Sequence, residues 1–247
     1  QENLDPMYAE TVVLAIERQF GPRTSVELSY VDKQTRDIFE DTCNGNLPNP
    51  SADAACDFYT IDNFSDLRRD YEGLILKLES RPIDRLYLLA SYTHAKSRGS
   101  IEDTQNAGTD FDVFPVHFVN RYGNLSDDRR HRLKVNGYLD LPVGFTVGFS
   151  GFWSSAYAYS KTESASPYGS EFLEPRGFFR GNANFQLDLE ARKGFQLGRI
   201  NTQLIATVLN ALDSERATGR CGNAAGCGSG IPFGGETDHQ QPRNYEV

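Results

Sequence analysis

A stretch of alternating side chains between residues 129 and 160, RRHRLKVNGYLDLPVGFTVGFSGFWSSAYAYS, constrains the fold more than any other part of the chain. Its first half alternates apolar with polar residues, so one face of a strand would carry Leu133, Val135, Gly137, Leu139 and Leu141. A Pro142-Val143-Gly144 turn follows, and the second half repeats the alternation with apolar residues at Phe145, Val147, Phe149 and Trp153. The pattern predicts a β-hairpin in which each strand has one apolar and one polar face.

The length of these strands and the chemistry of their polar faces favour a membrane-spanning hairpin. About 9 to 11 tilted residues cross a bilayer, whereas a strand of a globular protein usually has about 5 or 6. The polar faces carry glycine, small hydroxyl and charged residues, which a water-filled lumen tolerates. Trp153, Tyr157 and Tyr159 lie toward the far end of the second strand of the hairpin. Amphipathic aromatic side chains prefer the membrane interface, so this end is expected to lie there.

The same alternation recurs along the chain. Strands are predicted at residues 8–20, 24–34, 73–79, 86–93, 133–141, 145–154, 185–192 and 200–208, and a ninth opens at Tyr245-Glu246-Val247. Short turns join the two strands of each hairpin, whereas the connections between hairpins are long, about 20 to 30 residues, and rich in turn-forming residues. The regular succession of short turns and long connections is typical of outer-membrane β-barrels, in which short turns are periplasmic and long loops are external. The fold class predicted is therefore all-β, an antiparallel transmembrane β-barrel.

Composition excludes several other classes of protein. No run of apolar residues approaches the roughly 18 that a membrane helix needs. The net charge of -9 argues against a general nucleic-acid binder, which would need a basic surface to neutralise phosphates. The sequence holds neither a Gly-x-Ser-x-Gly elbow nor a phosphate-binding loop. Neither an enzyme nor a bound cofactor is therefore predicted.

The four cysteines form two close pairs, each within a long connection. Zinc sites usually show Cys-x2-Cys spacing or nearby histidines, and neither is present. Local pairs in turn-rich segments suit disulfides in an oxidising compartment. We therefore predict the disulfides Cys43–Cys56 and Cys221–Cys227.

One acidic segment is a candidate calcium site. Its carboxylates are Glu102, Asp103, Asp110 and Asp112. Clustered oxygens of this kind can bind calcium, but the segment lacks the position-by-position order of an EF-hand loop. A solvated acidic loop is the preferred interpretation.

A basic cluster surrounds His131, where Arg129, Arg130 and Arg132 lie side by side in the sequence. Guanidinium groups match phosphate oxygens in shape and charge, so lipopolysaccharide phosphate is one candidate ligand. The preferred interpretation is a strand end whose charges are satisfied by neighbouring carboxylates.

Charged side chains on the polar strand faces are predicted to face the lumen. They are Glu27, Lys77, Lys134, Asp140, Asp188, Glu190 and Arg192. A hydrated interior holds such charges without any catalytic purpose, so they are not assigned as acids or bases.

Three short segments carry a resemblance to a known family. The sequence DDRRHR at 127–132, with the LPVGF turn at 141–145, resembles the late barrel hairpins of TonB-dependent outer-membrane receptors, particularly the Oar-like group. Residues 208–213, VLNALD, resemble the exit from the penultimate strand of these barrels, and residues 242–247, PRNYEV, are similar to the start of their closing strand.

The resemblance implies a barrel of about 22 strands that is closed by an N-terminal plug and imports a scarce ligand with energy relayed by TonB. Nine strands cannot close such a barrel. Residues 1–247 are therefore expected to be the C-terminal part of one barrel domain, without the plug and the N-terminal strands. The implied location is the outer membrane of a Gram-negative bacterium, where long loops form an external binding vestibule. The implied partners are membrane lipid and lipopolysaccharide, the plug, TonB and the imported ligand.

Two alternatives remain open from the sequence. A self-contained surface or adhesion barrel would need an even number of strands. A secreted, soluble β-sandwich that binds carbohydrate would need shorter strands and aromatic residues on a concave polar face.

Overall fold

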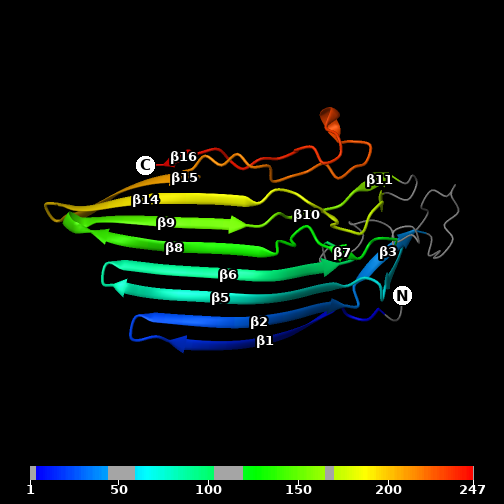
Figure 1. Ribbon diagram of the computed structural model, residues 1–247, viewed down its shortest axis with the longest axis horizontal. Coiled ribbons are helices and arrows are strands. Elements are labelled where there is room, and N and C mark those ends of the chain that lie inside the picture. The colour runs from blue at the N-terminus through cyan, green and yellow to red at the C-terminus, as the bar shows by residue number, and fades with distance from the viewer. Residues whose placement is uncertain (1–3, 44–58, 103–118, 165–169, 247) are drawn as a thin grey trace.

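The computed structural model describes residues 4–43, 59–102, 119–164 and 170–246, and its largest element is one antiparallel sheet (Figure 1). Nine strands follow one another across this sheet in their order along the chain, and the short β7 (Gly123–Asn124) pairs with one of them off this path. The nine are β1 (Tyr8–Gln19), β2 (Thr24–Arg36), β5 (Arg69–Ile83), β6 (Leu86–Gly99), β8 (His131–Leu141), β9 (Phe145–Ser154), β14 (Asn184–Leu197), β15 (Ile200–Leu209) and β16 (Asn244–Glu246).

The first eight of these strands are between 10 and 15 residues long. They exceed the usual globular strand of about 5 or 6 residues and are long enough to cross a bilayer. Apolar residues recur in them with a period of two, which suits a strand with one apolar face and does not suit a helix. Across the described ranges, no helix combines the length and apolar character that crossing a membrane requires.

The two ends of the sheet differ in their connections (Figure 1). At one end, the turn end, short turns join β1 to β2, β5 to β6, β8 to β9 and β14 to β15, one of them the short helix η1 (Pro142–Gly144). Gly21 and Gly198 have φ values of 68° and 61° in these turns, a left-handed conformation that glycine adopts without strain. At the other end, the loop end, the long connections carry β3 (Phe39–Cys43), β4 (Tyr59–Asn63), β10 (Ala158–Tyr159), β11 (Thr162–Ser164), β12 (Ser170–Phe172), β13 (Phe179–Arg180) and the short helix η2 (Gly228–Gly230).

Several strands extend beyond the predicted limits, mostly toward the loop end. β5 begins at Arg69 and not at residue 73, and β6 continues to Gly99 and not to 93. Polar residues occupy both faces of these extensions, so the alternation that predicts a strand is lost there. The first long connection also contains the paired strands β3 and β4, where no regular structure was predicted.

The register of the strands separates apolar from polar side chains. One row of paired residues, from β2 to β14, consists of Leu28, Leu76, Tyr92, Leu133, Trp153 and Phe185. The next row consists of Glu27, Lys77, Ser91, Lys134, Phe152 and Gln186, on the opposite face. Pairing in this register therefore gives the sheet one apolar and one largely polar face.

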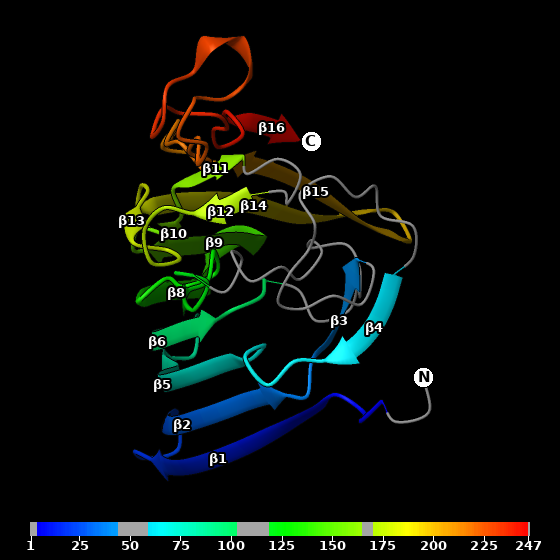
Figure 2. The same cartoon turned by 90° about the vertical axis from the view of Figure 1, so that its right-hand side faces the viewer.

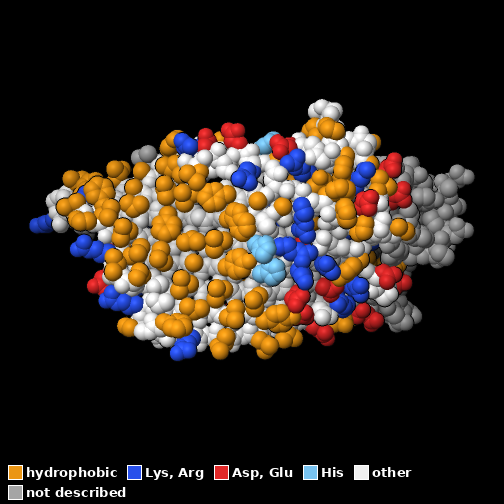
Figure 3. All heavy atoms as spheres, viewed as in Figure 1, with side chains coloured by type: hydrophobic (Ala, Val, Ile, Leu, Met, Phe, Trp, Pro, Cys, Tyr) orange, Lys and Arg blue, Asp and Glu red, His pale blue; other side chains and the backbone are white. Residues whose placement is uncertain are grey.

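The apolar face is the convex side of a curved sheet. Figure 2 shows the sheet curving from β1 to β16, with β3 and β4 on its concave side. Figure 3 shows the convex side, where hydrophobic side chains cover the area of the strands. Leu74 and Leu76 are 45% and 44% exposed there, and no second sheet packs against this face in the part of the chain that the structure describes. A soluble sandwich would bury such a face, so this arrangement does not support that alternative.

The buried apolar core lies at the loop end. Ile38, Leu67 and Ile101 form a cluster in which each residue is at most 2% exposed, and Met7 and Phe64 pack against it. These residues lie just outside the ends of β2, β5 and β6. The cluster therefore fixes the beginnings of the long connections to the strands that they leave.

Gly137 on β8 provides a test of the strand packing. A Cβ at this position would lie 2.5 Å from the Tyr87 carbonyl oxygen and 2.8 Å from Cζ of Phe149. We expect Gly137→Ala to lower the free energy of unfolding by about 1 to 3 kcal/mol because backbone has to move. Gly148→Ala is the matched control, since its nearest neighbours would lie 3.8 Å away. Equilibrium unfolding in urea measures both variants, and equal losses would contradict this packing.

Candidate functional site

The seven charged residues predicted to face the lumen share the concave face of the sheet. The strand registers place Glu27, Lys77, Lys134, Asp140, Asp188, Glu190 and Arg192 on this side. They share one side because side chains alternate between the two faces along each strand, and the registers align these faces from strand to strand. Whether this side borders a closed lumen remains a prediction.

Most of these charges have partners on neighbouring positions. Lys77 lies 4.0 Å from the Glu27 carboxylate, and Arg192 pairs with Glu190. Asp140 accepts a hydrogen bond of 2.7 Å from the Thr146 hydroxyl. The concave face is thus polar, but its charges are largely balanced in pairs.

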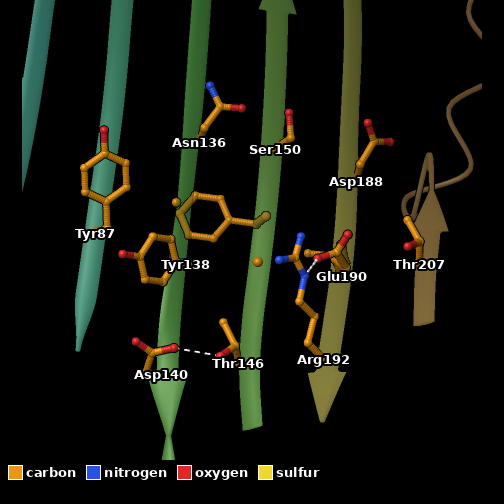
Figure 4. A pocket seen from close by; sticks show the side chains of 14 residues that line it. Tyr87, Asn136, Tyr138, Asp140, Thr146, Ser150, Asp188, Glu190, Arg192 and Thr207 are labelled. Carbon is orange, nitrogen blue, oxygen red and sulfur yellow. Dashed lines mark hydrogen bonds and ion pairs between the residues drawn. The ribbon is translucent and has the colours of Figure 1, made fainter. Parts of the chain in front are cut away.

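A groove of about 490 Å³ lies on this face toward the turn end (Figure 4). The rings of Tyr87 and Tyr138 stack on one side of it, with their centroids 5.5 Å apart. On the other side are the Glu190–Arg192 pair and Asp188, whose carboxylate accepts a hydrogen bond from the Asn210 backbone N–H. Stacked aromatic rings opposite paired charges form a surface that can pack against another protein segment.

Asp128 is the charged centre of the loop end. Its side chain is fully buried, and Oδ1 accepts a hydrogen bond of 2.9 Å from the Ser97 backbone N–H. Oδ2 accepts from Arg130 Nε at 3.0 Å and from the Arg180 guanidinium at 2.5 Å. One carboxylate therefore ties together β6, the start of β8 and β13.

The basic residues around His131 are divided between different partners and faces, and Arg130 meets a carboxylate as the preferred interpretation expects. Arg130 is satisfied by Asp128, and Arg132 donates to the Asp127 carbonyl oxygen at 2.6 Å. Arg132 pairs with Thr93 on the concave face, whereas His131 pairs with His94 on the convex face. Neighbours in a strand point to opposite sides, so the cluster is divided by the sheet.

A second cavity, of about 430 Å³, lies among the connections at the loop end, and we call it the loop-end pocket. It is lined by Arg129, Tyr157, Arg220 and Asp238, among others. The Arg129 guanidinium lies over the Tyr157 ring, 5.1 Å from its centroid. Burial lowers the pKa of the Arg129 guanidinium and raises the pKa of the Tyr157 hydroxyl.

Aromatic and histidine side chains occupy the convex face where the strands approach the loop end. Tyr92 Oη lies 2.6 Å from His131 Nδ1, and the rings of His94 and His131 are 4.8 Å apart. Figure 3 shows histidines between the apolar area and a group of basic side chains. Trp153 lies on this face, as predicted. Tyr157 and Tyr159 lie at the loop end, where the ring centroids of Tyr159 and Phe179 are 5.6 Å apart.

The disulfide Cys221–Cys227 is formed, as predicted. Cys56 of the predicted pair Cys43–Cys56 lies outside the described residues, as do Asp103, Asp110 and Asp112 of the acidic segment, so these predictions are not tested. Glu102 pairs with Arg176 at 3.3 Å and accepts a hydrogen bond from the Ser126 backbone N–H. Among the residues that are described, no three or more His, Cys, Asp or Glu side chains gather to hold a metal ion.

Sequence reasoning missed the residues that complete the loop end. Arg180 lies 52 positions from Asp128, and Tyr157 is in a segment without regular alternation. No local spacing connects such partners, because the folded connections alone bring them together.

Asp128 should be essential for stability. We expect Asp128→Asn to lower the free energy of unfolding by about 3 to 5 kcal/mol, because two guanidinium groups lose their shared carboxylate. Asp127→Asn is the control. Asp127 is half exposed and its carboxylate lies 3.6 Å from the Arg69 guanidinium. Such an exposed ion pair contributes at most about 1 kcal/mol to the free energy of unfolding. Urea unfolding of both variants measures the difference. Losses of similar size would show that Asp128 does not organise the loop end.

Solved structures share this fold over nearly the whole chain. The outer membrane transporter YddB from Escherichia coli has a TM-score of 0.66 at 12% identity, with 98% of this chain and 32% of that protein covered. The ferric-catecholate import receptor Fiu from E. coli has a TM-score of 0.57 at 13% identity, covering 98% and 27%. The ferripyoverdine receptor of the outer membrane of Pseudomonas aeruginosa has a TM-score of 0.58 at 16% identity, covering 98% and 27%. The chain thus spans about a third or less of each.

A comparison with curated protein sequences gives no match. The model of the family described as outer membrane beta barrel domain matches residues 1–158. Family and fold together place the chain in the outer membrane of a Gram-negative bacterium and confirm the predicted resemblance to outer-membrane receptor barrels. The chain belongs to the outer membrane beta barrel domain family.

Proposed function

We propose that the chain is part of the barrel wall of a TonB-dependent receptor that imports a scarce ligand across the outer membrane. The observation that carries this proposal is the opposite chemistry of the two faces of one curved sheet. The convex face is apolar and exposed, whereas the concave face carries balanced charges and a groove. The convex face suits contact with lipid, and the concave face suits contact with water or protein.

The two open edges of the sheet support the proposal that it is part of a larger barrel. β1 and β16 each pair on one side only within the described strands. An open edge in hydrocarbon leaves backbone groups without hydrogen bonds, at a cost of several kcal/mol each. Further strands would remove both edges, so we assign residues 1–247 to the C-terminal part of one barrel domain. Receptor structures several times longer than this chain have room for those strands and a plug.

The groove near the turn end is the proposed contact with the plug. In this orientation the short turns are periplasmic and the long connections are external. The Tyr87–Tyr138 stack and the Glu190–Arg192 pair would then face the interior from the periplasmic half of the wall. The plug and TonB are the protein partners that this function requires.

The loop end is the proposed external vestibule, and the convex face is the proposed contact with lipid and lipopolysaccharide. Tyr92, His94 and Trp153 lie where such a membrane interface would be expected, because amphipathic rings favour that depth. Neither an adhesion barrel nor a soluble sandwich is favoured by a specific observation.

Uptake measurements test the proposed function. Cells that carry the full-length protein would be supplied with radiolabelled ferric siderophores and cobalamin, with strains lacking the protein or TonB as controls. We expect accumulation of at least one compound to require both proteins, because import against a gradient needs relayed energy. If removal of the protein instead lowers only passive entry of small sugars, the protein is a pore and the proposal is wrong.

A further inference from the structure

The loop-end pocket contains an arginine whose charge has no acidic partner. Among the described residues, Arg129 Nη1 donates to two neutral oxygens, at 3.3 Å to Ser154 Oγ and at 3.4 Å to the Ser155 carbonyl. Throughout the described residues, no carboxylate lies within ion-pair distance of Arg129. A partly buried cation without a counter-charge is unfavourable, so an anion in the pocket would be stabilised.

Other arginines around the same pocket are neutralised. Arg130 and Arg180 share Asp128, and Arg220 pairs with Glu236 at 3.0 Å. Glu102 also lines the cavity and is paired with Arg176 at 3.3 Å, so within the described residues Arg129 is the lining cation without an ion pair. Its guanidinium is also held in place by the Tyr157 ring beneath it.

The Tyr157 ring fixes Arg129 from below. The residue is 7% exposed, and its ring and hydroxyl pack against Gly181, where an added Cβ would lie 2.4 Å from Cζ and 2.9 Å from Oη. The hydroxyl is enclosed by protein and faces Gly181, so the ring is the part of Tyr157 that serves the pocket, as a fixed support for the guanidinium.

We propose that the loop-end pocket binds an oxyanion, a carboxylate or a phosphate group of a small ligand, with Arg129, held over the Tyr157 ring, as its counter-charge. The Asp238 carboxylate also lines the cavity and accepts a hydrogen bond from Thr237 Oγ1. It favours ligands whose oxyanion is accompanied by hydroxyl or amino donors. A cavity of about 430 Å³ fits a small organic acid.

This inference deepens the proposed function, because it names the chemistry that the external vestibule of the receptor would recognise. It is tested by binding, which is measured separately from uptake. The full-length protein, extracted from outer membranes in detergent, would be titrated calorimetrically with citrate and with inorganic phosphate in Tris chloride. We expect saturable binding of at least one of them.

Variants locate the binding site. Arg129→Gln should weaken binding at least about tenfold, because it removes the charge that the oxyanion contacts. Tyr157→Leu should weaken it about three- to tenfold, because the ring that holds the Arg129 guanidinium is lost. Arg216→Gln is the matched control, since Arg216 is exposed, donates to the Ala183 carbonyl and does not line the pocket. Arg216→Gln should bind like the original protein.

The outcomes separate this inference from the proposed function. Saturable binding that Arg129→Gln and Tyr157→Leu weaken and Arg216→Gln preserves supports the oxyanion site, even if no TonB-dependent uptake is found. Absence of saturable binding, or equal binding by Arg129→Gln and the original protein, overturns the site even if uptake depends on TonB. Migration of unheated samples in gels verifies that each variant retains its folded barrel.

Discussion

The structure depends on satisfying backbone hydrogen bonds between neighbouring strands, because hydrocarbon offers no other partner for these groups. A meander of long strands meets this requirement, since each of the seven strands between β1 and β16 pairs with a neighbour on both sides. Short turns close one end of every hairpin, where little polar backbone needs to be accommodated. The long connections gather at the other end, where water and their own side chains can satisfy them.

Pairing in register then decides what each face presents. A slip of one residue would exchange the apolar and polar rows, so the continuous row from Leu28 to Phe185 requires every pair to be aligned. The loop end is organised differently, around a small apolar cluster and the buried Asp128 carboxylate. This base positions Arg129, two residues before β8, and Tyr157, three residues after β9.

The sequence predicts features that depend on near neighbours and misses features that depend on folding. The faces of β8 and β9 follow from period-two alternation, and the Cys221–Cys227 disulfide follows from close spacing. The extensions of β5 and β6 were missed because both of their faces are polar beyond Gly73 and Ala95. The Asp128–Arg180 pair and the contact of Arg129 with Tyr157 join residues whose sequence context shows no pattern. Adjacency of Arg132 and His131 allowed a single basic site as one candidate, but successive residues of β8 point to opposite faces of the sheet.

Spin labels placed one at a time at residues 146–151 of β9, in the full-length protein reconstituted in lipid, test most directly whether the convex face contacts the membrane. Collisions with oxygen report lipid, and collisions with a polar nickel complex report water. Labels at Val147, Phe149 and Gly151 should meet oxygen, whereas labels at Thr146, Gly148 and Ser150 should be shielded from lipid. If labels on both faces meet the nickel complex equally, the convex face does not contact lipid and the chain is not part of a membrane barrel.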